Sequence, residues 1–242
     1  MPAAKIPDEC ATGFSAGGII PAPCAPSTPL PQDPLPAELP SDPLPLFAQW
    51  FEAAQARRAQ PNPDAMVLAT ATVDGRPSAR VVLLKRLVVE PGYVVFYTNY
   101  DSRKGRELEA NPRAAAVVHW DTLGRQVRLE GAVSVSPPEE SDAYFGSRPL
   151  DSRIGAWASL QSQPLDERAT LLARVAAESA RLGTDVPRPP RWGGYRLWPE
   201  AVELWTEGEF RIHDRARWTR SLALESPGAF RVGPWYATRL YP

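Results

Sequence analysis

The stretch "AMVLATATVDGRPSARVVLLKRLVVEPGYVVFYT", residues 65 to 98, establishes the fold class. It holds three apolar segments, "AMVLATATV", "SARVVLLKRLVV" and "YVVFYT", each rich in β-branched or aromatic residues and bounded by turn formers such as Asp74-Gly75. Short segments of this kind, joined by tight turns, are typical of an antiparallel meander. "RVVLLK" is apolar on both faces, because Val82 and Leu84 point one way while Val81 and Leu83 point the other. This predicts a barrel wall that also meets a partner subunit.

Helices are predicted on either side of this meander. "SDPLPLFAQWFEAAQARR" begins the folded part, with Asp42 as a cap, Pro43 at the first helical position and an apolar stripe of Phe47, Trp50, Phe51 and Ala54. "DSRKGRELEANP" predicts a short helix that is capped by Asp101 or Ser102 and ends at Asn111-Pro112.

The rest of the chain continues this mixture. "AAAVVHW", "RQVRLEGAVSVS", "GGYRLWPEAVELW", "EFRIHDRARW" and "WYATRLYP" are predicted strands, whereas "PEESDAYFGSRP" and "DERATLLARVAAESARL" are predicted helices. We therefore expect one α+β domain over residues 42–242, mainly antiparallel β and barrel-like, with peripheral helices. Residues 1–41 are proline-rich, and we expect a disordered or extended arm.

Composition narrows the class of protein. A hydrophobic content of 43% can fill a core, and a net charge of −1 provides no global field for nucleic acid or an anionic membrane. No run approaches the roughly 18 apolar residues that a membrane helix needs. The two cysteines, Cys10 and Cys24, both lie in the arm, which argues against a disulfide scaffold. We expect a cytoplasmic protein without a membrane or nucleic-acid partner.

Several common kinds of site are missing from the sequence. His119 and His213 are the only histidines, and no Cys/His ligand spacing exists, so we predict no metal site. There is neither a G-x-S-x-G elbow nor a G-x-G-x-x-G fingerprint.

Clustered cations remain as the candidate chemistry. If "FRIHDR" is extended, Arg211, His213 and Arg215 share one face, and such a cluster favours a bound anion. Arg103 and Lys104 fall in the first turn of a predicted helix, where only an anion would make positive side chains favourable. The plainer alternatives are a solvated Arg103–Glu107 pair and an ordinary basic surface strand.

Taken in order, ten blocks resemble the pyridoxamine 5′-phosphate oxidase family from about residue 42 to the end. They are "RVVLLK", "FYTNYDSRKGREL", "NPRAA", "RQVRLEG", "YFGSRPLDSRIGAWAS", "QSQP", "WGGYR", "VELW", "RIHDR" and "RLYP". The resemblance implies an FMN-binding split β-barrel homodimer, with FMN at the subunit interface. It also implies oxidation of pyridoxamine or pyridoxine 5′-phosphate to pyridoxal 5′-phosphate, with dioxygen as acceptor and hydrogen peroxide as product.

The resemblance also implies roles for individual residues. Arg211 and His213 would be catalytic, Arg211 as an orienting cation and His213 as a hydrogen-bonding partner over the pyridine ring. Substrate contacts would come from Lys85, Tyr144, Arg148, Ser152, Arg211 and His213. FMN contacts would come from Arg80, Val81, Val82, Leu83, Leu84, Lys85, Tyr97, Thr98, Arg103, Lys104, Gln126, Gln161, Ser162, Trp205 and Arg215. Two phosphate esters, each near −2 at neutral pH, would then account for most of the clustered cations.

The chain departs from the family pattern at two places. The arm lacks the arginine and tyrosine that commonly close over the substrate, and Leu204 and Thr206 replace an aromatic residue and a glutamine beside Trp205. Two alternatives therefore stay open. One is an FMN oxidase of another aromatic metabolite, of the phenazine type; the other is a non-catalytic split-barrel protein that binds FMN or pyridoxal phosphate.

Overall fold

The structure is a computed structural model that describes residues 34–242. Residues 1–33, and with them Cys10, Cys24 and most of the predicted arm, lie outside the described residues. Residues 34–41 contain no helix or strand, yet Leu35 is buried and the Pro40 carbonyl accepts a hydrogen bond from the Trp218 indole at 2.7 Å. No helix in the described part is long and apolar enough to cross a membrane.

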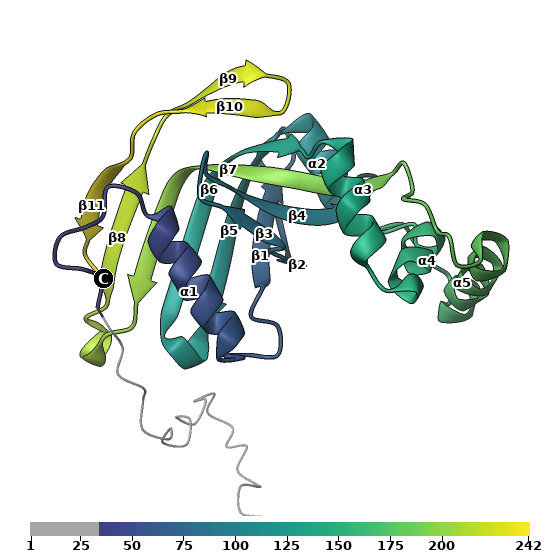
Figure 1. Ribbon diagram of the computed structural model, residues 1–242, viewed down its shortest axis with the longest axis horizontal. Helices are drawn as coiled ribbons and strands as arrows, with labels where there is room; N and C mark the ends of the chain where they lie inside the picture. The colour runs from purple at the N-terminus through teal and green to yellow at the C-terminus, as the bar shows by residue number, and fades with distance from the viewer. Residues whose placement is uncertain (1–33) are drawn as a thin grey trace, which may run out of the picture. The chain divides into compact units, whose positions relative to one another are not determined.

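A nine-stranded antiparallel sheet forms the body of the domain (Figure 1). Its main path runs β11-β8-β7-β6-β5-β1-β2, while β4 pairs with both β7 and β3. The strands are β1 (Ala65–Ala71), β2 (Pro77–Leu83), β3 (Arg86–Val88), β4 (Tyr93–Asn99), β5 (Arg113–Trp120), β6 (Arg125–Val135), β7 (Trp192–Thr206), β8 (Asp214–Thr219) and β11 (Tyr236–Leu240). A separate hairpin pairs β9 (Leu222–Ser226) with β10 (Ala229–Val232).

Five α-helices and two short 3-10 turns accompany the sheet. They are α1 (Leu44–Ala56), α2 (Arg103–Ala110), η1 (Asp121–Leu123), α3 (Pro138–Ser147), α4 (Leu150–Ala158), α5 (Arg168–Leu182) and η2 (Glu209–Arg211). Figure 1 shows α1 lying across the curled sheet, with α3, α4 and α5 gathered beyond one end of β4 and β7.

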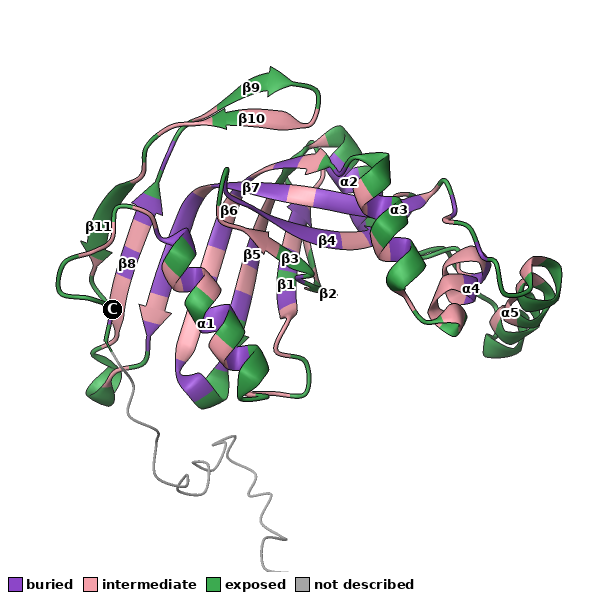
Figure 2. Ribbon diagram, viewed as in Figure 1, coloured by how far each residue is buried: buried purple, intermediate pink, exposed green. Residues whose placement is uncertain are grey.

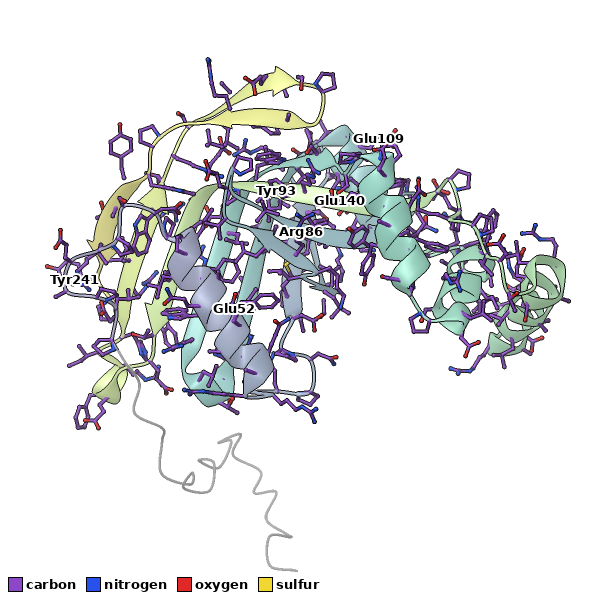
Figure 3. All side chains as sticks on the ribbon, in the orientation of Figure 1. Glu52, Arg86, Tyr93, Glu109, Glu140 and Tyr241 are labelled. Carbon is purple, nitrogen blue, oxygen red and sulfur yellow. The ribbon has the colours of Figure 1, made fainter. Side chains whose placement is uncertain are left out.

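The core lies between α1 and the sheet (Figure 2). Phe47, Trp50 and Phe51 are buried against strand residues such as Trp120 and Leu129, whereas Glu52 on the opposite side of the helix is exposed (Figure 3). Each fully buried aromatic side chain stabilises the fold by roughly 2–3 kcal/mol. The apolar side chains that recur at helical spacing in the sequence therefore hold α1 against the sheet.

The predicted fold class is confirmed: the described chain is α+β, mainly antiparallel β, with peripheral helices. The structure also resolves the predicted caps. Ser102, rather than Asp101, caps α2 by accepting from the Gly105 amide, and Asp42 accepts from the Leu44 amide at the start of α1. Pro43 stands at the N-cap of α1 and not at its first helical position.

Two local predictions are wrong. "LDSRIGAWA" forms α4, a helix that we did not predict. "EFRIHDRARW" is a strand only from Asp214, because residues 209–211 form η2 with Phe210 and Arg211 at φ values of 56° and 65°. Gly208 permits this turn, because a Cβ at that position would lie 1.9 Å from the Ile212 carbonyl oxygen. Arg211, His213 and Arg215 therefore do not alternate along one extended strand.

Candidate functional site

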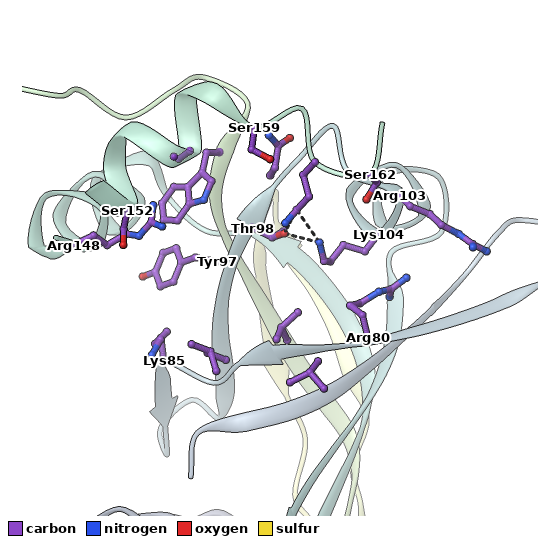
Figure 4. A pocket seen from close by; sticks show the side chains of 18 of the residues that line it. Arg80, Lys85, Tyr97, Thr98, Arg103, Lys104, Arg148, Ser152, Ser159 and Ser162 are labelled. Atoms are coloured by element: carbon purple, nitrogen blue, oxygen red, sulfur yellow. Dashed lines mark hydrogen bonds between the residues drawn. The ribbon is translucent and has the colours of Figure 1, made fainter. Parts of the chain in front are cut away.

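A cavity of about 810 Å³ opens beside β2, β4, α2 and α4 (Figure 4). Long-range pairing and packing, and not local sequence, bring these elements together. The cavity is lined by Ser78, Ala79, Arg80, Val81, Val82, Leu83, Lys85, Tyr97, Thr98, Asn99, Arg103, Lys104, Tyr144, Arg148, Ser152, Gly155, Ala156, Ser159, Gln161, Ser162 and Trp192.

Lys104 is the most deeply buried of the five cations that line this cavity, with 6% of the residue exposed. Its ammonium group donates to Thr98 Oγ1 at 2.8 Å, Gln161 Oε1 at 3.0 Å and Ser102 Oγ at 3.2 Å, all neutral oxygens. Among the described residues it has no carboxylate within ion-pair distance. Burial, together with the charge of Arg80, lowers the pKa of Lys104 from 10.5 to about 8. An anion in the cavity would offset the free-energy cost of burying the Lys104 ammonium without a counter-charge.

Glu107 is a buried carboxylate behind the cavity wall. It accepts hydrogen bonds from Thr70 Oγ1 at 2.5 Å, Ser78 Oγ at 2.6 Å and Arg103 Nε at 2.8 Å. Burial alone would raise the pKa of Glu107, but the hydrogen bonds from Ser78, Thr70 and Arg103 lower it to about 2. The predicted solvated Arg103–Glu107 pair is therefore only half solvated: Arg103 is exposed, but Glu107 is not.

Arg148 stands on the opposite side of the cavity, next to α4. Its guanidinium lies 4.8 Å from the centre of the Trp192 ring, and its buried Nη1 has no hydrogen-bond partner in the described structure. Burial lowers the pKa of Arg148, but an arginine stays protonated in proteins. A charged donor that is buried without an acceptor is costly, so an anion bound beside Arg148 would be favourable.

Stacked aromatic rings form the wall beside Arg148. The Tyr97 and Tyr144 ring centres are 3.9 Å apart with 16° between the planes, and Trp192 stacks on Tyr97 at 5.6 Å. Burial, with the nearby Glu140 charge, raises the pKa of Tyr97 to about 12, so its hydroxyl stays neutral. Such a wall provides a flat apolar surface beside charged donors, which suits an aromatic phosphate ester.

The cavity brings together most of the residues that the sequence singled out. Those are Arg80, Val81, Val82, Leu83, Lys85, Tyr97, Thr98, Arg103, Lys104, Tyr144, Arg148, Ser152, Gln161 and Ser162. Lys85 also pairs with Asp64 at 2.5 Å. Leu84 is different, because its side chain is fully buried in the hydrophobic core and does not line the cavity.

Five predicted site residues lie elsewhere, in a second cluster across β6, β7 and β8. Gln126, Trp205 and Arg215 are direct neighbours in strand register, and the His213 ring lies 4.7 Å from the Trp205 ring. Arg211 is exposed next to them on η2.

Hydrogen bonds hold this second cluster in place. His213 Nδ1 accepts from the Gly208 amide at 3.2 Å, and Arg215 donates to the buried Glu203 at 2.9 Å and to the Tyr241 carbonyl at 3.0 Å. Because Nδ1 accepts, the ring proton of neutral His213 belongs on Nε2, which makes that atom a donor.

Strand β7 separates the two clusters within one chain. Its Gly193 and Gly194 pair with Thr98 and Tyr97 at the cavity, whereas Trp205 lies 11 residues further along the same strand. At about 3.3 Å per residue this corresponds to roughly 35 Å along the strand. One chain therefore does not join the two clusters into one site.

Sequence reasoning missed Glu107, Ser78 and Trp192 as parts of the cavity and its wall. The i, i+4 spacing of Arg103 and Glu107 was the one feature of the sequence that drew attention to Glu107. No sequence pattern related Glu107 to Ser78 or Arg80. No group of three or more His, Cys, Asp or Glu side chains in residues 34–242 is placed to hold a metal ion.

Comparisons with known proteins agree on one family. Residues 52–181 match the family model "Pyridoxamine 5′-phosphate oxidase", and residues 192–242 match "Pyridoxine 5′-phosphate oxidase C-terminal dimerisation region". A pyridoxine/pyridoxamine 5′-phosphate oxidase from Burkholderia lata is 52% identical over 206 residues, which cover 85% of this chain and 92% of that protein.

Solved structures extend the comparison. PhzG from Burkholderia lata 383, in complex with tetrahydrophenazine-1-carboxylic acid, is 35% identical with a TM-score of 0.75, over 84% of this chain and 94% of that one. A pyridoxamine 5′-phosphate oxidase-related, FMN-binding protein from Nostoc punctiforme shares the fold, with 16% identity and a TM-score of 0.61, over 82% of this chain and 97% of that one.

Proposed function

Because the chain belongs to the pyridoxamine 5′-phosphate oxidase family, we propose that it oxidises pyridoxamine or pyridoxine 5′-phosphate to pyridoxal 5′-phosphate. Dioxygen is the electron acceptor and hydrogen peroxide the product. The family makes the chain an FMN-dependent oxidase, and FMN is its cofactor. The identity of the substrate, a phosphorylated B6 vitamer, is our proposal.

The residues present fit FMN. Lys104 is buried in the cavity wall, where its partners among residues 34–242 are all neutral oxygens, and Arg80 and Arg103 line the same cavity. Three cations so placed suit a phosphate dianion, while the hydroxyls of Thr98 and Ser162 and the Gln161 amide offer uncharged hydrogen bonds. These residues would hold the cofactor.

Arg148 is the single observation that carries the substrate assignment. Arg148 lines the cavity together with Tyr144 and Ser152, and its buried Nη1 has no hydrogen-bond partner among the described residues. Arg148 and Ser152 lie apart from Lys104 (Figure 4). A second phosphate, on the substrate, would supply the missing acceptor, and the stacked tyrosines would support the pyridine ring. Binding energy at this distant phosphate would fix the register of the reacting carbon.

A homodimer would complete the site. Arg211 and His213 do not reach the cavity of their own chain, and residues 192–242 match a dimerisation region. Val67 and Val81 are register partners with exposed side chains, which supports an apolar contact between subunits. We infer that the second cluster of one subunit faces the cavity of the other, with FMN at the interface.

The chain's own residues position and hydrogen-bond the reactants. Arg148, Tyr144, Ser152 and Lys85 hold the substrate phosphate, Arg211 orients the pyridine ring, and His213 Nε2 donates a hydrogen bond near the reacting face. Lys104, Arg80 and Arg103 would hold FMN, which would supply a hydride acceptor for the carbon that bears the amine or alcohol and a route for both electrons to dioxygen. For the amine substrate, water then releases ammonia from the imine product.

The PhzG match favours one alternative, oxidation of a phenazine precursor. One observation weighs against it. Identity to the Burkholderia lata vitamer oxidase is 52%, whereas identity to PhzG of that species is 35%.

An anaerobic titration of the FMN-loaded protein would test the proposal. We expect pyridoxamine 5′-phosphate to bleach the visible flavin absorption, with colour and peroxide returning on admission of air. Pyridoxamine without its phosphate should be a far weaker reductant, and Arg148→Ala should raise the KM for the phosphorylated substrate by about tenfold or more. Bleaching by tetrahydrophenazine-1-carboxylic acid and not by the vitamer would favour the phenazine reading; no bleaching by either would favour a binding protein.

A further inference from the structure

We propose that Glu107 is a positioning residue that holds Arg80 and Arg103 in place for the phosphate of FMN. This inference rests on the proposed function, because it concerns the cofactor's anionic end. Glu107 does not line the cavity itself. It would therefore act through the arginines and not by contact with the cofactor.

The contacts of Glu107 converge from three elements. It belongs to α2, while Thr70 belongs to β1, and Ser78 and Arg80 to β2. Arg103 binds one carboxylate oxygen at 2.8 Å, and both hydroxyls donate to the other oxygen. The carboxylate thus fastens the start of α2 to the strand pair that carries Arg80.

Arg80 is held mainly through the two hydroxyls. Its Nη1 donates to Thr70 Oγ1 at 2.6 Å and its Nη2 to Ser78 Oγ at 2.5 Å, while Glu107 itself is 3.5 Å away. Because both hydroxyls give their protons to Glu107, their lone pairs face the guanidinium. A neutral side chain at position 107 would leave the hydroxyls free to turn.

A surface ion pair does not explain this arrangement. The Glu107 side chain is 5% exposed, whereas the carboxylate of the Arg76–Asp74 pair is 60% exposed. Burying a carboxylate is costly unless several donors satisfy it, and here Thr70, Ser78 and Arg103 do. A buried carboxylate near the proposed phosphate position would repel the phosphate. This repulsion is offset if the carboxylate holds the two arginines that bind the phosphate.

Two effects of neutralising Glu107 have opposite signs. Removal of a negative charge would strengthen binding of an anion through space, whereas loss of the anchored arginines would weaken it. Positioning therefore predicts weaker FMN binding in Glu107→Gln, and a simple electrostatic role predicts tighter binding. The sign of the change separates the two.

The test uses flavin-free protein that is titrated with FMN and, separately, with riboflavin, which has the same ring system without the phosphate. Quenching of flavin fluorescence gives both Kd values. We expect Glu107→Gln to raise the Kd for FMN about tenfold, the scale of one charge-assisted hydrogen bond, and to leave the Kd for riboflavin within about twofold. Glu109→Gln, on the exposed face of the same helix (Figure 3), is the matched control and should change neither.

A second pair of variants keeps the carboxylate intact. Thr70→Val removes one hydroxyl link between Arg80 and Glu107, and Thr70→Ser retains it. We expect Thr70→Val to weaken FMN binding selectively and Thr70→Ser to preserve it.

Each contrary result has a distinct meaning. An unchanged or lower Kd for FMN in Glu107→Gln would overturn the inference, and so would equal weakening of FMN and riboflavin, which would show a role in the fold alone. If the unaltered protein bound FMN no more tightly than riboflavin, the proposed phosphate site would fail, and the inference with it.

Discussion

Single residues in the cavity carry charge that the other residues of the described part, 34–242, do not neutralise. Lys104 is buried among neutral oxygens, and Arg148 has a buried nitrogen without an acceptor. Burial of a charge without a counter-charge costs free energy, so these residues lower the stability of the flavin-free protein, and binding of an anion would offset that cost. The flavin-free protein should be less stable than the loaded one for this reason.

The lowered pKa of Lys104 leads to a pH dependence. In the flavin-free protein Lys104 loses its proton as pH rises through about 8, well below its ordinary value of 10.5. The FMN phosphate is already a dianion above pH 7, so the change of charge between pH 7 and pH 9 occurs on Lys104 and not on the phosphate. We expect the Kd for FMN to rise about tenfold between pH 7 and pH 9, because the neutral amine no longer attracts the phosphate.

The variant Lys104→Met isolates this effect. It should bind FMN weakly and with little dependence on pH over the same range, as measured by fluorescence titration; a pH dependence equal to that of the unaltered protein would contradict the assignment.

The lowered pKa of Lys104 also affects the free energy of unfolding of the flavin-free protein, which should rise with pH while the affinity for FMN falls. Between about pH 8 and 10.5 the unfolded chain holds the extra proton, so the flavin-free protein should become more stable as pH rises through this window.

At the scale of elements, the start of α2 presents two cations to the cavity. Ser102 caps the helix, and the next two residues are Arg103 and Lys104. The third residue, Gly105, allows the helix to approach the preceding loop, because a Cβ there would lie 1.9 Å from the Tyr100 carbonyl oxygen. The glycine thus sets where the helix begins relative to β4.

Gly105→Ala should therefore destabilise the protein. Alanine favours a helix over glycine by about 1 kcal/mol, but an overlap with backbone forces a larger shift, and we expect a net loss of about 1–3 kcal/mol. Urea unfolding would measure it. The matched control is Gly146→Ala in α3, where a Cβ meets nothing within 4 Å, so its stability should stay the same or rise. Equal effects of the two substitutions would refute the close-approach argument.

At the scale of the whole molecule, the site is divided. The cavity is at one end of β7 and the cluster around Trp205 at the other, so in the proposed function each chain would hold two incomplete halves. A second copy would join them, and the exposed apolar face around Val81, of which 64% is accessible in the single chain, would be the contact. Dimerisation and cofactor binding should then be coupled.

Val81→Asp tests this coupling. A carboxylate buried at an apolar interface costs several kcal/mol, so we expect a monomer by light scattering and loss of bound FMN. Val73→Asp, at an exposed valine in the turn between β1 and β2, should leave the protein a dimer with its flavin. If Val81→Asp stayed a dimer, or the unaltered protein were a monomer, the divided-site interpretation would be wrong.

The fold class could be read from local pattern. β-Branched segments with tight turns predicted the meander, and the stripe on α1 predicted its buried face. These features depend on neighbours a few positions apart, and periodicity records such relations directly. The cavity residues Arg80 and Arg148 were predicted from the family resemblance, and Arg103 also from its place in the first turn of a predicted helix.

Other features depend on residues that are distant in the chain. Glu107 meets Thr70 and Ser78 only because α2 packs beside β1 and β2, and Arg211 lies outside the expected strand, in a turn where Gly208 and Ile212 approach closely. The separation of the two clusters likewise follows from the length of β7. Such contacts are selected by packing across the whole domain, and no local periodicity encodes them, so they emerge only when the chain is folded.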